Sequence, residues 1–337
     1  MAPDAATDQV IATCGGDARE AVKALIVANE FLEREIKRRF RDDICVARSA
    51  GGSIRIRANG TMGQAKVKNR STLDFALKFP RCSLCGGDRT TTTREHMPPR
   101  SLFDNKHRPD KLVMPACLEC NKGTSTADLT ASLISRWAIE SSPESQTDHR
   151  KLAAQARRQA PELVNEWLSR DNPIQQIGAR QHLARFGVNA PPNAKFATIG
   201  PLTIRQLNIF SHKVALALYF EHFGKPLSND GRVQAIWKTK EDFFRNGVPY
   251  ELLELMGKYG TLTQGRWNAS ETFEYRYDLH TSDGLFGCFA RLRQGLFVLG
   301  FAIADARMLV DSPGLDGEWI MPRNLLGNNP HFSKKHG

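Results

Sequence analysis

Cys82-Ser-Leu-Cys85 and Cys117-Leu-Glu-Cys120 are two cysteine pairs that decide how this chain folds locally, and 31 residues separate them. Both pairs have the C-x-x-C spacing, in which two thiolates close together in the chain bind one metal ion. Four thiolates form a closed tetrahedral site of the structural zinc type, and four unrelated cysteines would not share one spacing. The segment between the pairs has few apolar residues, so a metal would replace a missing core. We therefore predict that these four cysteines bind structural zinc.

An acid–histidine pair lies between the cysteine pairs, in Arg94-Glu95-His96-Met97-Pro98-Pro99, and an amide follows the second pair at Asn121. The β-branched run 90–93 favours a strand that leads to the pair. A return strand at 112–114 and a short helix at 117–121 complete a ββα element. We expect His96 on the first strand and Asn121 on the helix to face one another, so that a divalent cation can be held between Glu95 and Asn121.

These residue types suit the hydrolysis of a phosphodiester bond. A histidine with a pKa near neutrality can take a proton from water. Carboxylate and amide oxygens are hard ligands that suit Mg²⁺ or Mn²⁺, and the cation polarises the phosphate and stabilises the leaving oxygen. Arg94, Arg100 and Lys122 are placed to contact phosphates.

The run resembles the HNH, or ββα-metal, endonucleases, specifically the zinc-stabilised branch with C-x-x-C, an acid-His-x-x-Pro core and C-x-x-C-Asn in this order. The resemblance covers about residues 80–130. It implies that His96 is the general base and that Glu95 and Asn121 bind the catalytic metal. The family often has aspartate where this chain has Glu95. The middle asparagine of the family signature, which orients the histidine, falls near Asp110, and Asn105 is a second candidate.

The positive charge of the chain is concentrated around this run. The net charge is +11, and residues 48–136 hold 16 Lys and Arg against 7 Asp and Glu. A basic region around a candidate site favours a polyanion, and we expect double-stranded DNA as the partner. Residues 48–73 contain no acid. They form either a basic hairpin on a phosphate backbone or a solubilising linker, and as a hairpin they would contact nucleic acid through Arg55, Arg57, Lys66 and Lys68.

The sequence also predicts the cellular compartment of the protein. No apolar run is long enough for a membrane span, and the N-terminus lacks the features of a secretory signal. We therefore expect a cytoplasmic protein with reduced thiols and no membrane partner. The remaining cysteines, Cys14, Cys45 and Cys288, are expected to be ordinary thiols. His212, His222 and His280 lack metal-ligand spacing and are expected to be structural or surface residues.

The chain divides into five predicted segments, and its fold class is α+β. They are an N-terminal helical segment (1–47), a basic hairpin or linker (48–73), a zinc-stabilised HNH module (74–140), a helical connector (141–190) and a C-terminal α+β region (191–337). Periodicity predicts helices at 126–137 and 148–187, and a helix that starts at a Thr203/Gln206 capping box and ends at Gly224. Alternation of apolar and charged residues predicts a strand at 273–279. Two apolar runs that flank Arg293-Gln294-Gly295 predict a hairpin of 285–292 with 296–303.

The combined prediction is a divalent-metal-dependent HNH endonuclease that cuts DNA, in a setting such as restriction or defence against foreign DNA. The alternative is a zinc-stapled nucleic-acid-binding module without catalysis. A zinc hydrolase of small molecules is disfavoured because four thiolates leave the zinc no open position. The sequence leaves open DNA against RNA, sequence specificity, nicking against double-strand cutting, and whether the N-terminal helix or the C-terminal region binds a partner or a second copy.

Overall fold

The structure is a computed structural model, and it describes residues 72–109, 111–137, 143–169, 172–185, 196–240, 242, 253, 256–264, 267–309 and 318–327. Contacts divide the chain into one unit of 62–182 with 190–337 and another of 1–61 with 183–189. All described residues except 183–185 belong to the first unit. The predicted segment 1–47 and nearly all of 48–73 lie outside the described residues. The described part combines helices and strands, so the α+β class is confirmed.

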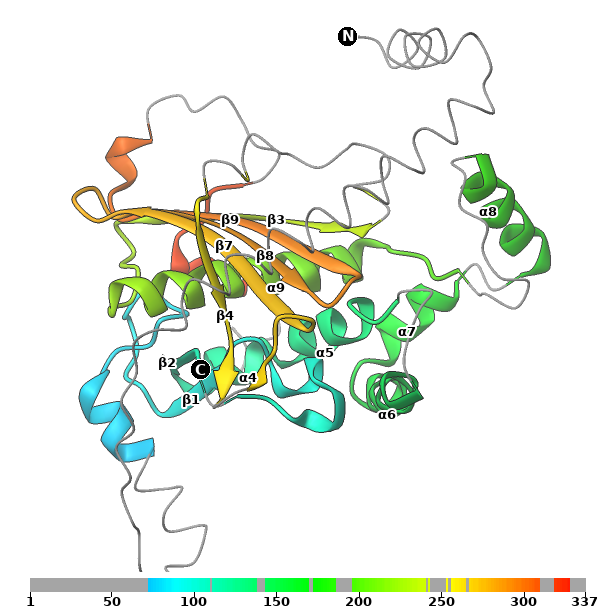
Figure 1. Cartoon of the computed structure of the whole chain (residues 1–337), viewed down its shortest axis with the longest axis horizontal. Helices are drawn as coiled ribbons and strands as arrows, with labels where there is room; N and C mark the ends of the chain where they lie inside the picture. The colour runs from blue at the N-terminus through cyan, green and yellow to red at the C-terminus, as the bar shows by residue number, and fades with distance from the viewer. Residues whose placement is uncertain are drawn as a thin grey trace, which may run out of the picture. The chain divides into compact units, whose positions relative to one another are not determined.

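A five-stranded antiparallel sheet is the largest β-structure among these residues (Figure 1). Its strand order is β3 (Arg232–Thr239), β9 (Leu296–Ile303), β8 (Leu285–Leu292), β7 (Phe273–His280) and β4 (Lys258–Thr261). The predicted hairpin is confirmed, since β8 and β9 pair with Leu292 opposite Leu296. Along β8, the residues Phe286, Cys288, Ala290 and Leu292 are buried and alternate with more exposed ones, as a sheet covered on one face requires.

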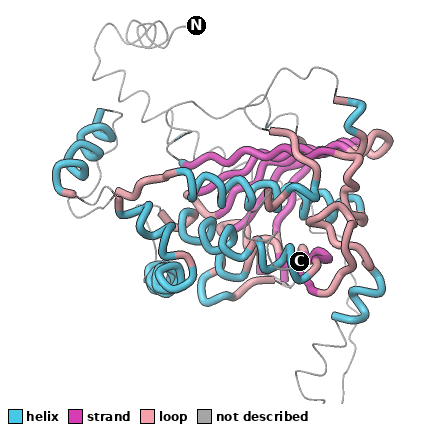
Figure 2. Tube along the Cα trace, turned by 180° about the vertical axis from the view of Figure 1, so that it is seen from behind, coloured by secondary structure: helices cyan, strands magenta, loops and turns pink. Residues whose placement is uncertain are grey.

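Helix α9 (Pro201–Phe223) covers that buried face and contacts β3, β8 and β9. A Cβ at Gly300 of β9 would lie 2.8 Å from the Cβ of Ala215, so the close approach of helix and strand needs glycine there. On its other side α9 contacts α5 (Ser125–Ile134) and β2 (Val113–Ala116). Figure 2 shows these helices gathered on one side of the sheet. A helix covered on two sides is apolar around most of its circumference, which explains why residues 209–220 are all buried.

The ends of α9 show one prediction confirmed and one corrected. Gly224 ends the helix in the left-handed conformation, with φ of 68°, as expected of a C-terminal glycine. The predicted capping box at Thr203 is wrong, because the helix begins at Pro201 and Gly200 is its N-cap. The carboxylate of Glu166 accepts hydrogen bonds from the backbone N–H groups of Gly200, Leu202 and Thr203. An acid from another helix therefore satisfies the first turn.

The predicted order of strand, loop, strand and short helix is present in the cysteine-pair region. Strand β1 (Thr93–His96) pairs antiparallel with β2, with Glu95 opposite Met114 and His96 opposite Val113. Two 3-10 turns, η1 (Arg100–Leu102) and η2 (Asp104–Lys106), lie in the loop between the strands. Helix α4 (Leu118–Gly123) follows β2 and leads into α5. Residues 72–78, ahead of the first cysteine pair, are helical.

The predicted helical stretch 148–187 is helical but broken into three. It contains α6 (Pro143–Gln159), α7 (Pro161–Leu168) and α8 (Pro173–Arg185). Each of the three helices begins with a proline. Proline lacks a backbone N–H, which costs nothing in the first turn of a helix but removes a hydrogen bond from a helix interior, so a proline favours the start of a new helix. Helix α6 packs on α5 and α7 packs on α6, around a small core that includes Leu133, Leu152 and Trp167. The remaining short elements are β5 (Thr263–Gln264), β6 (Trp267–Asn268), η3 (Ala306–Met308) and η4 (Pro322–Asn324).

The main hydrophobic core runs through both the cysteine-pair region and the C-terminal region. It includes the four cysteines, Met114 of β2, Phe210 of α9 and Phe286 of β8. The described parts of 74–140 and 191–337 are therefore stabilised by the same buried apolar surface. Among the helices that the structure describes, none is long and apolar enough to cross a membrane.

Candidate metal centre and the neighbouring hairpin

The four predicted zinc ligands come together in one buried cluster. The sulfur atoms of Cys82, Cys85, Cys117 and Cys120 all lie within 4.8 Å of one another. The first pair sits in a tight turn in which Gly86 and Gly87 have positive φ, a conformation that costs glycine little. The second pair lies at the start of α4, where the Cys120 N–H points at the Cys117 sulfur at 3.4 Å. The cluster could bind a metal such as zinc.

The electrostatics of the cluster fit that chemistry. Hydrogen bonds from Cys120 and Cys82 lower the pKa of Cys85 to about 2. Hydrogen bonds to Cys82 and Cys85 raise the pKa of Cys120, and burial of this thiol raises it further. Four buried thiols can thus share protons, but they cannot all become thiolates without a compensating charge. A soft divalent cation supplies that charge, and Arg89 adds a weaker contribution at 3.9 Å from the Cys120 sulfur.

The C-terminal region braces the first cysteine turn. The amide nitrogen of Asn229 donates to the Cys85 carbonyl oxygen at 3.1 Å and to Asp88 at 2.8 Å. A Cβ at Gly86 would lie 2.5 Å from the Asn229 side chain. The amide oxygen of Asn229 accepts the backbone N–H of Arg323 at 2.9 Å. The cysteine turn is therefore held by residues more than 140 positions away in the chain, and local motif reading could not find them.

Glu95 is buried, and its carboxylate is held by a lysine. Lys213 of α9 donates to Glu95 Oε1 at 2.7 Å and to both carboxylate oxygens of Asp128 of α5, at 2.9 and 2.7 Å. Burial lowers the pKa of Lys213, but the two carboxylates outweigh it, so the pKa is raised and the ammonium stays charged. Burial raises the pKa of Asp128 to about 7, with a further contribution from Glu95 and an opposing one from Lys213. Sequence reasoning missed Lys213 and Asp128.

His96 belongs to the opposite face of β1. Successive side chains of a strand point to opposite faces, so Thr93 and Glu95 share one face and Arg94 and His96 share the other. Both Arg94 and His96 are half-buried. The Arg94 guanidinium lies over the Phe75 ring, 5.3 Å from its centroid, which draws the helical residues 72–78 to this face. The strand thus presents a basic group beside the predicted general base.

Asn121 approaches β1 from the Glu95 side. Its amide nitrogen donates to Thr93 Oγ1 at 3.0 Å, and Thr93 shares a face with Glu95. Because the nitrogen is used in this bond, the amide oxygen is the atom that remains for a cation. The strand alternation therefore places the two predicted cation ligands on one side of β1 and His96 on the other. The expectation that His96 and Asn121 face one another is wrong, because a strand directs adjacent side chains to opposite faces.

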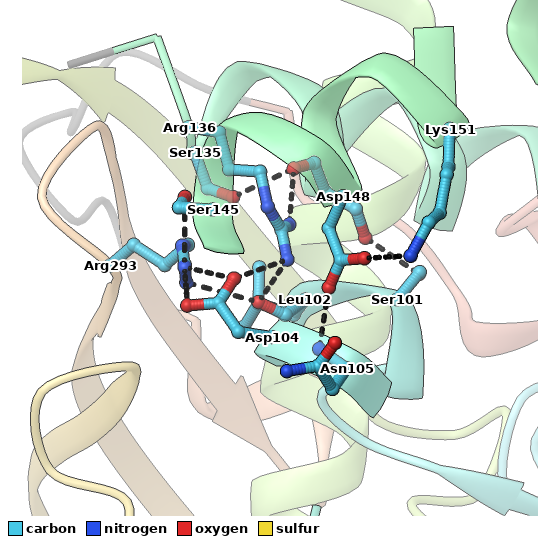
Figure 3. A network of polar contacts seen from close by, with 11 residues as sticks. Ser101, Leu102, Asp104, Asn105, Ser135, Arg136, Ser145, Asp148, Lys151 and Arg293 are labelled. Carbon is cyan, nitrogen blue, oxygen red and sulfur yellow. Dashed lines mark hydrogen bonds and ion pairs between the residues drawn. The ribbon is translucent and has the colours of Figure 1, made fainter. Parts of the chain in front are cut away.

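A polar network anchors the loop between β1 and β2 (Figure 3). The Asp104 carboxylate accepts two hydrogen bonds of 2.6 Å from Arg293, in the β8–β9 turn, and lies 3.4 Å from Arg136, just after α5. Burial, together with the nearby Arg293 charge, lowers the pKa of Arg136 to about 10. The backbone N–H of Asn105 donates to Asp148 of α6. The loop is therefore tied to the sheet and to α6 at the same place.

The other predicted site residues are distributed as follows. Asn105, the second candidate for orienting His96, has an exposed side chain and a left-handed backbone within the loop network. Asp110 lies outside the described residues, as do Arg55, Arg57, Lys66 and Lys68. Arg100 and Lys122 are exposed, the second of them on α4.

Comparison of the chain with protein-family models, with curated proteins and with solved structures found no match.

Proposed function

We propose that this protein is a divalent-metal-dependent endonuclease of the HNH type that hydrolyses phosphodiester bonds in DNA. The observation that carries the proposal is the juxtaposition of a β1–β2 hairpin, the following helix α4 and a buried four-cysteine cluster. In this element Glu95 and Asn121 approach from one side of β1, and Arg94 and His96 occupy the half-exposed other side. A ribbon that only bound zinc would not need these side chains at a strand end.

The catalytic roles follow from the donors and acceptors. The Glu95 oxygen Oε1 is bonded to Lys213, so we assign the second carboxylate oxygen and the Asn121 amide oxygen to Mg²⁺ or Mn²⁺. When bound, this cation would polarise the scissile phosphate. His96 takes the proton from the attacking water. His96 and the cation ligands lie on opposite faces of β1, so we propose that the scissile phosphate crosses the end of this strand, where it can reach both faces. The cysteine cluster holds structural zinc, and Arg94, Arg100 and Lys122 contact neighbouring phosphates.

One observation favours a second candidate, a zinc-stapled nucleic-acid-binding module without catalysis. Glu95 is buried, and its carboxylate already serves as a partner of Lys213. A residue with that role could be retained for structure alone. In this case the basic side chains around the cysteine cluster would bind nucleic acid, and no group would activate water.

A cleavage assay separates the two candidates. Wild-type protein is incubated with supercoiled DNA, single-stranded DNA and RNA across a series of divalent metals. It is compared with His96→Ala and with His280→Ala as a matched control, since His280 is an exposed histidine paired with Asp283. We expect wild type and the control to cut DNA, and His96→Ala to be slower by a factor of about 10² or more, the usual range for loss of a general base. Zinc content should be equal in all three.

The outcomes are distinct. Robust cleavage by His96→Ala would remove His96 from the mechanism. Binding of nucleic acid without turnover by the wild type, at any metal, would leave the binding module as the function. Cleavage of RNA alone would keep the chemistry and change the substrate.

A further inference from the structure

Lys213 is a charged residue at the centre of the protein. Its side chain is 0% exposed, and its ammonium lies 2.7 Å from Glu95 and 2.7 Å from Asp128. It stands on α9 between the sheet and the β1–β2 hairpin, 118 residues from Glu95 in the chain. The neighbours along the helix, such as Val214 and Phe210, are buried apolar residues.

Stability alone does not account for this lysine. Removing three charged groups from water is costly, and buried ion pairs are often no more stabilising than apolar residues of similar size. An apolar residue at position 213 would pack α9 against the hairpin without that cost, provided that positions 95 and 128 were apolar too. The lysine has three N–H donors, and its bonds to Asp128 and Glu95 aim them at fixed oxygen atoms. This geometry orients a carboxylate as well as neutralising it.

We propose that Lys213 is a positioning residue of the nuclease site, which holds Glu95 so that its second carboxylate oxygen faces the divalent cation, while Asp128 holds Lys213. The inference rests on the proposed function. Lys213 is not itself a catalytic residue, because it is fully buried on the inner side of β1 and cannot touch substrate. Glu95 is one of the two ligands proposed for the cation, so a loosely held Glu95 would bind the cation weakly.

The proposal gives the C-terminal α+β region a role in the site. The lysine that orients Glu95 lies on α9, and α9 is held against the hairpin by the core shared with the sheet. The cation site is therefore complete only when the C-terminal region is folded onto the cysteine-pair region. A nuclease module cut out of this chain at its motif boundaries would lack the residue that aligns its acid.

The test measures Mn²⁺ binding directly, on zinc-loaded full-length protein, by electron paramagnetic resonance of free Mn²⁺. Lys213→Met should raise the Mn²⁺ dissociation constant tenfold or more, with unchanged zinc content. Val214→Ala is the matched control, since it perturbs the next buried residue of the same helix and should leave the constant within twofold of wild type. Because Lys213 acts through Glu95, the double variant Glu95→Gln/Lys213→Met should bind Mn²⁺ no more weakly than Glu95→Gln.

A wild-type Mn²⁺ affinity in Lys213→Met would overturn the proposal, as would a further loss in the Glu95→Gln background. If Lys213→Met does not fold, Asp128→Asn decides the question. That variant keeps the shape of the side chain but weakens the anchor of Lys213, so the dissociation constant should rise at least threefold, and no rise overturns the proposal. Wild type that binds Mn²⁺ without cutting would refute the proposed function but not the positioning role. Wild type that binds no Mn²⁺ at millimolar concentration would refute both.

Discussion

Asp104→Asn should destabilise the protein by removing the carboxylate that Arg136 and Arg293 share. The side chains of Arg136 and Arg293 are 1% and 12% exposed, whereas that of Asp104 is 33% exposed. Removing one partner of a buried ion pair costs about 3–5 kcal/mol. Arg136 keeps its bonds to the Ser132 and Leu102 carbonyls, and water can reach position 104, so we expect a loss of about 2–3 kcal/mol after discounting for screening.

The free energy of unfolding is measured by urea denaturation at 25 °C, followed by tryptophan fluorescence and by circular dichroism. Asp305→Asn is the control, because Asp305 pairs with Arg307 on the surface and the Arg307 side chain is 90% exposed. That variant should unfold at the wild-type urea concentration. Equal midpoints for Asp104→Asn and the control would show that the network is replaced by water, and that the loop between β1 and β2 does not depend on it.

Two further predictions concern the metal and the pH dependence. Zinc is the metal proposed for the cysteine cluster, so Cys120→Ser should contain less than one zinc per chain, measured by mass spectrometry of metal content. The variant should also have a lower unfolding midpoint, because the cysteines line the main core. One zinc per chain in this variant would contradict the four-thiolate assignment. Burial, with a contribution from Lys258, lowers the pKa of His222 from 6.5 to about 4. As the pH is lowered, His222 is therefore protonated in the unfolded chain before it is protonated in the folded protein. The free energy of unfolding should decrease as the pH is lowered from about 6.5 to about 4. In His222→Phe this part of the pH profile should flatten, and a profile unchanged from wild type would mean that other groups produce it.

The burial of Glu95 changes how the acid–histidine pair is understood. From the sequence, Glu95 and His96 form a single reactive pair beside one another. In the fold they occupy opposite faces of β1, one directed to Lys213 in the core and the other to the half-exposed side with Arg94. The acid therefore has two partners to satisfy, an internal ammonium and the proposed cation. The Mn²⁺ measurements test whether the bond to Lys213 prepares Glu95 to bind the cation.

Much of the local structure could be predicted because its determinants lie within a few residues of one another. The hairpin of β8 and β9 is predicted at both strands by two apolar runs that flank Arg293-Gln294-Gly295, and it is confirmed. The C-terminal end of α9 is predicted from Gly224, with Pro226 beyond it, and is confirmed. The predicted start of that helix failed because its cap, Glu166, comes from another helix. Helical structure is predicted over 148–187, but not its division into separate helices, two of which begin at prolines within that stretch.

The sequence by itself determined which residues could form the metal cluster and which residue types are available for phosphodiester chemistry. A repeated C-x-x-C spacing constrains the sulfurs of each pair through the intervening backbone, so it can be read without a fold. Only the tertiary structure decided that Glu95 is paired with Lys213 and Asp128, that Asn229 braces the cysteine turn, and that the loop is anchored through Asp104. These contacts join residues from 85 to 189 positions apart. Such pairs are set by how α9 and the sheet pack on the hairpin, and no periodicity or spacing in the chain encodes them directly.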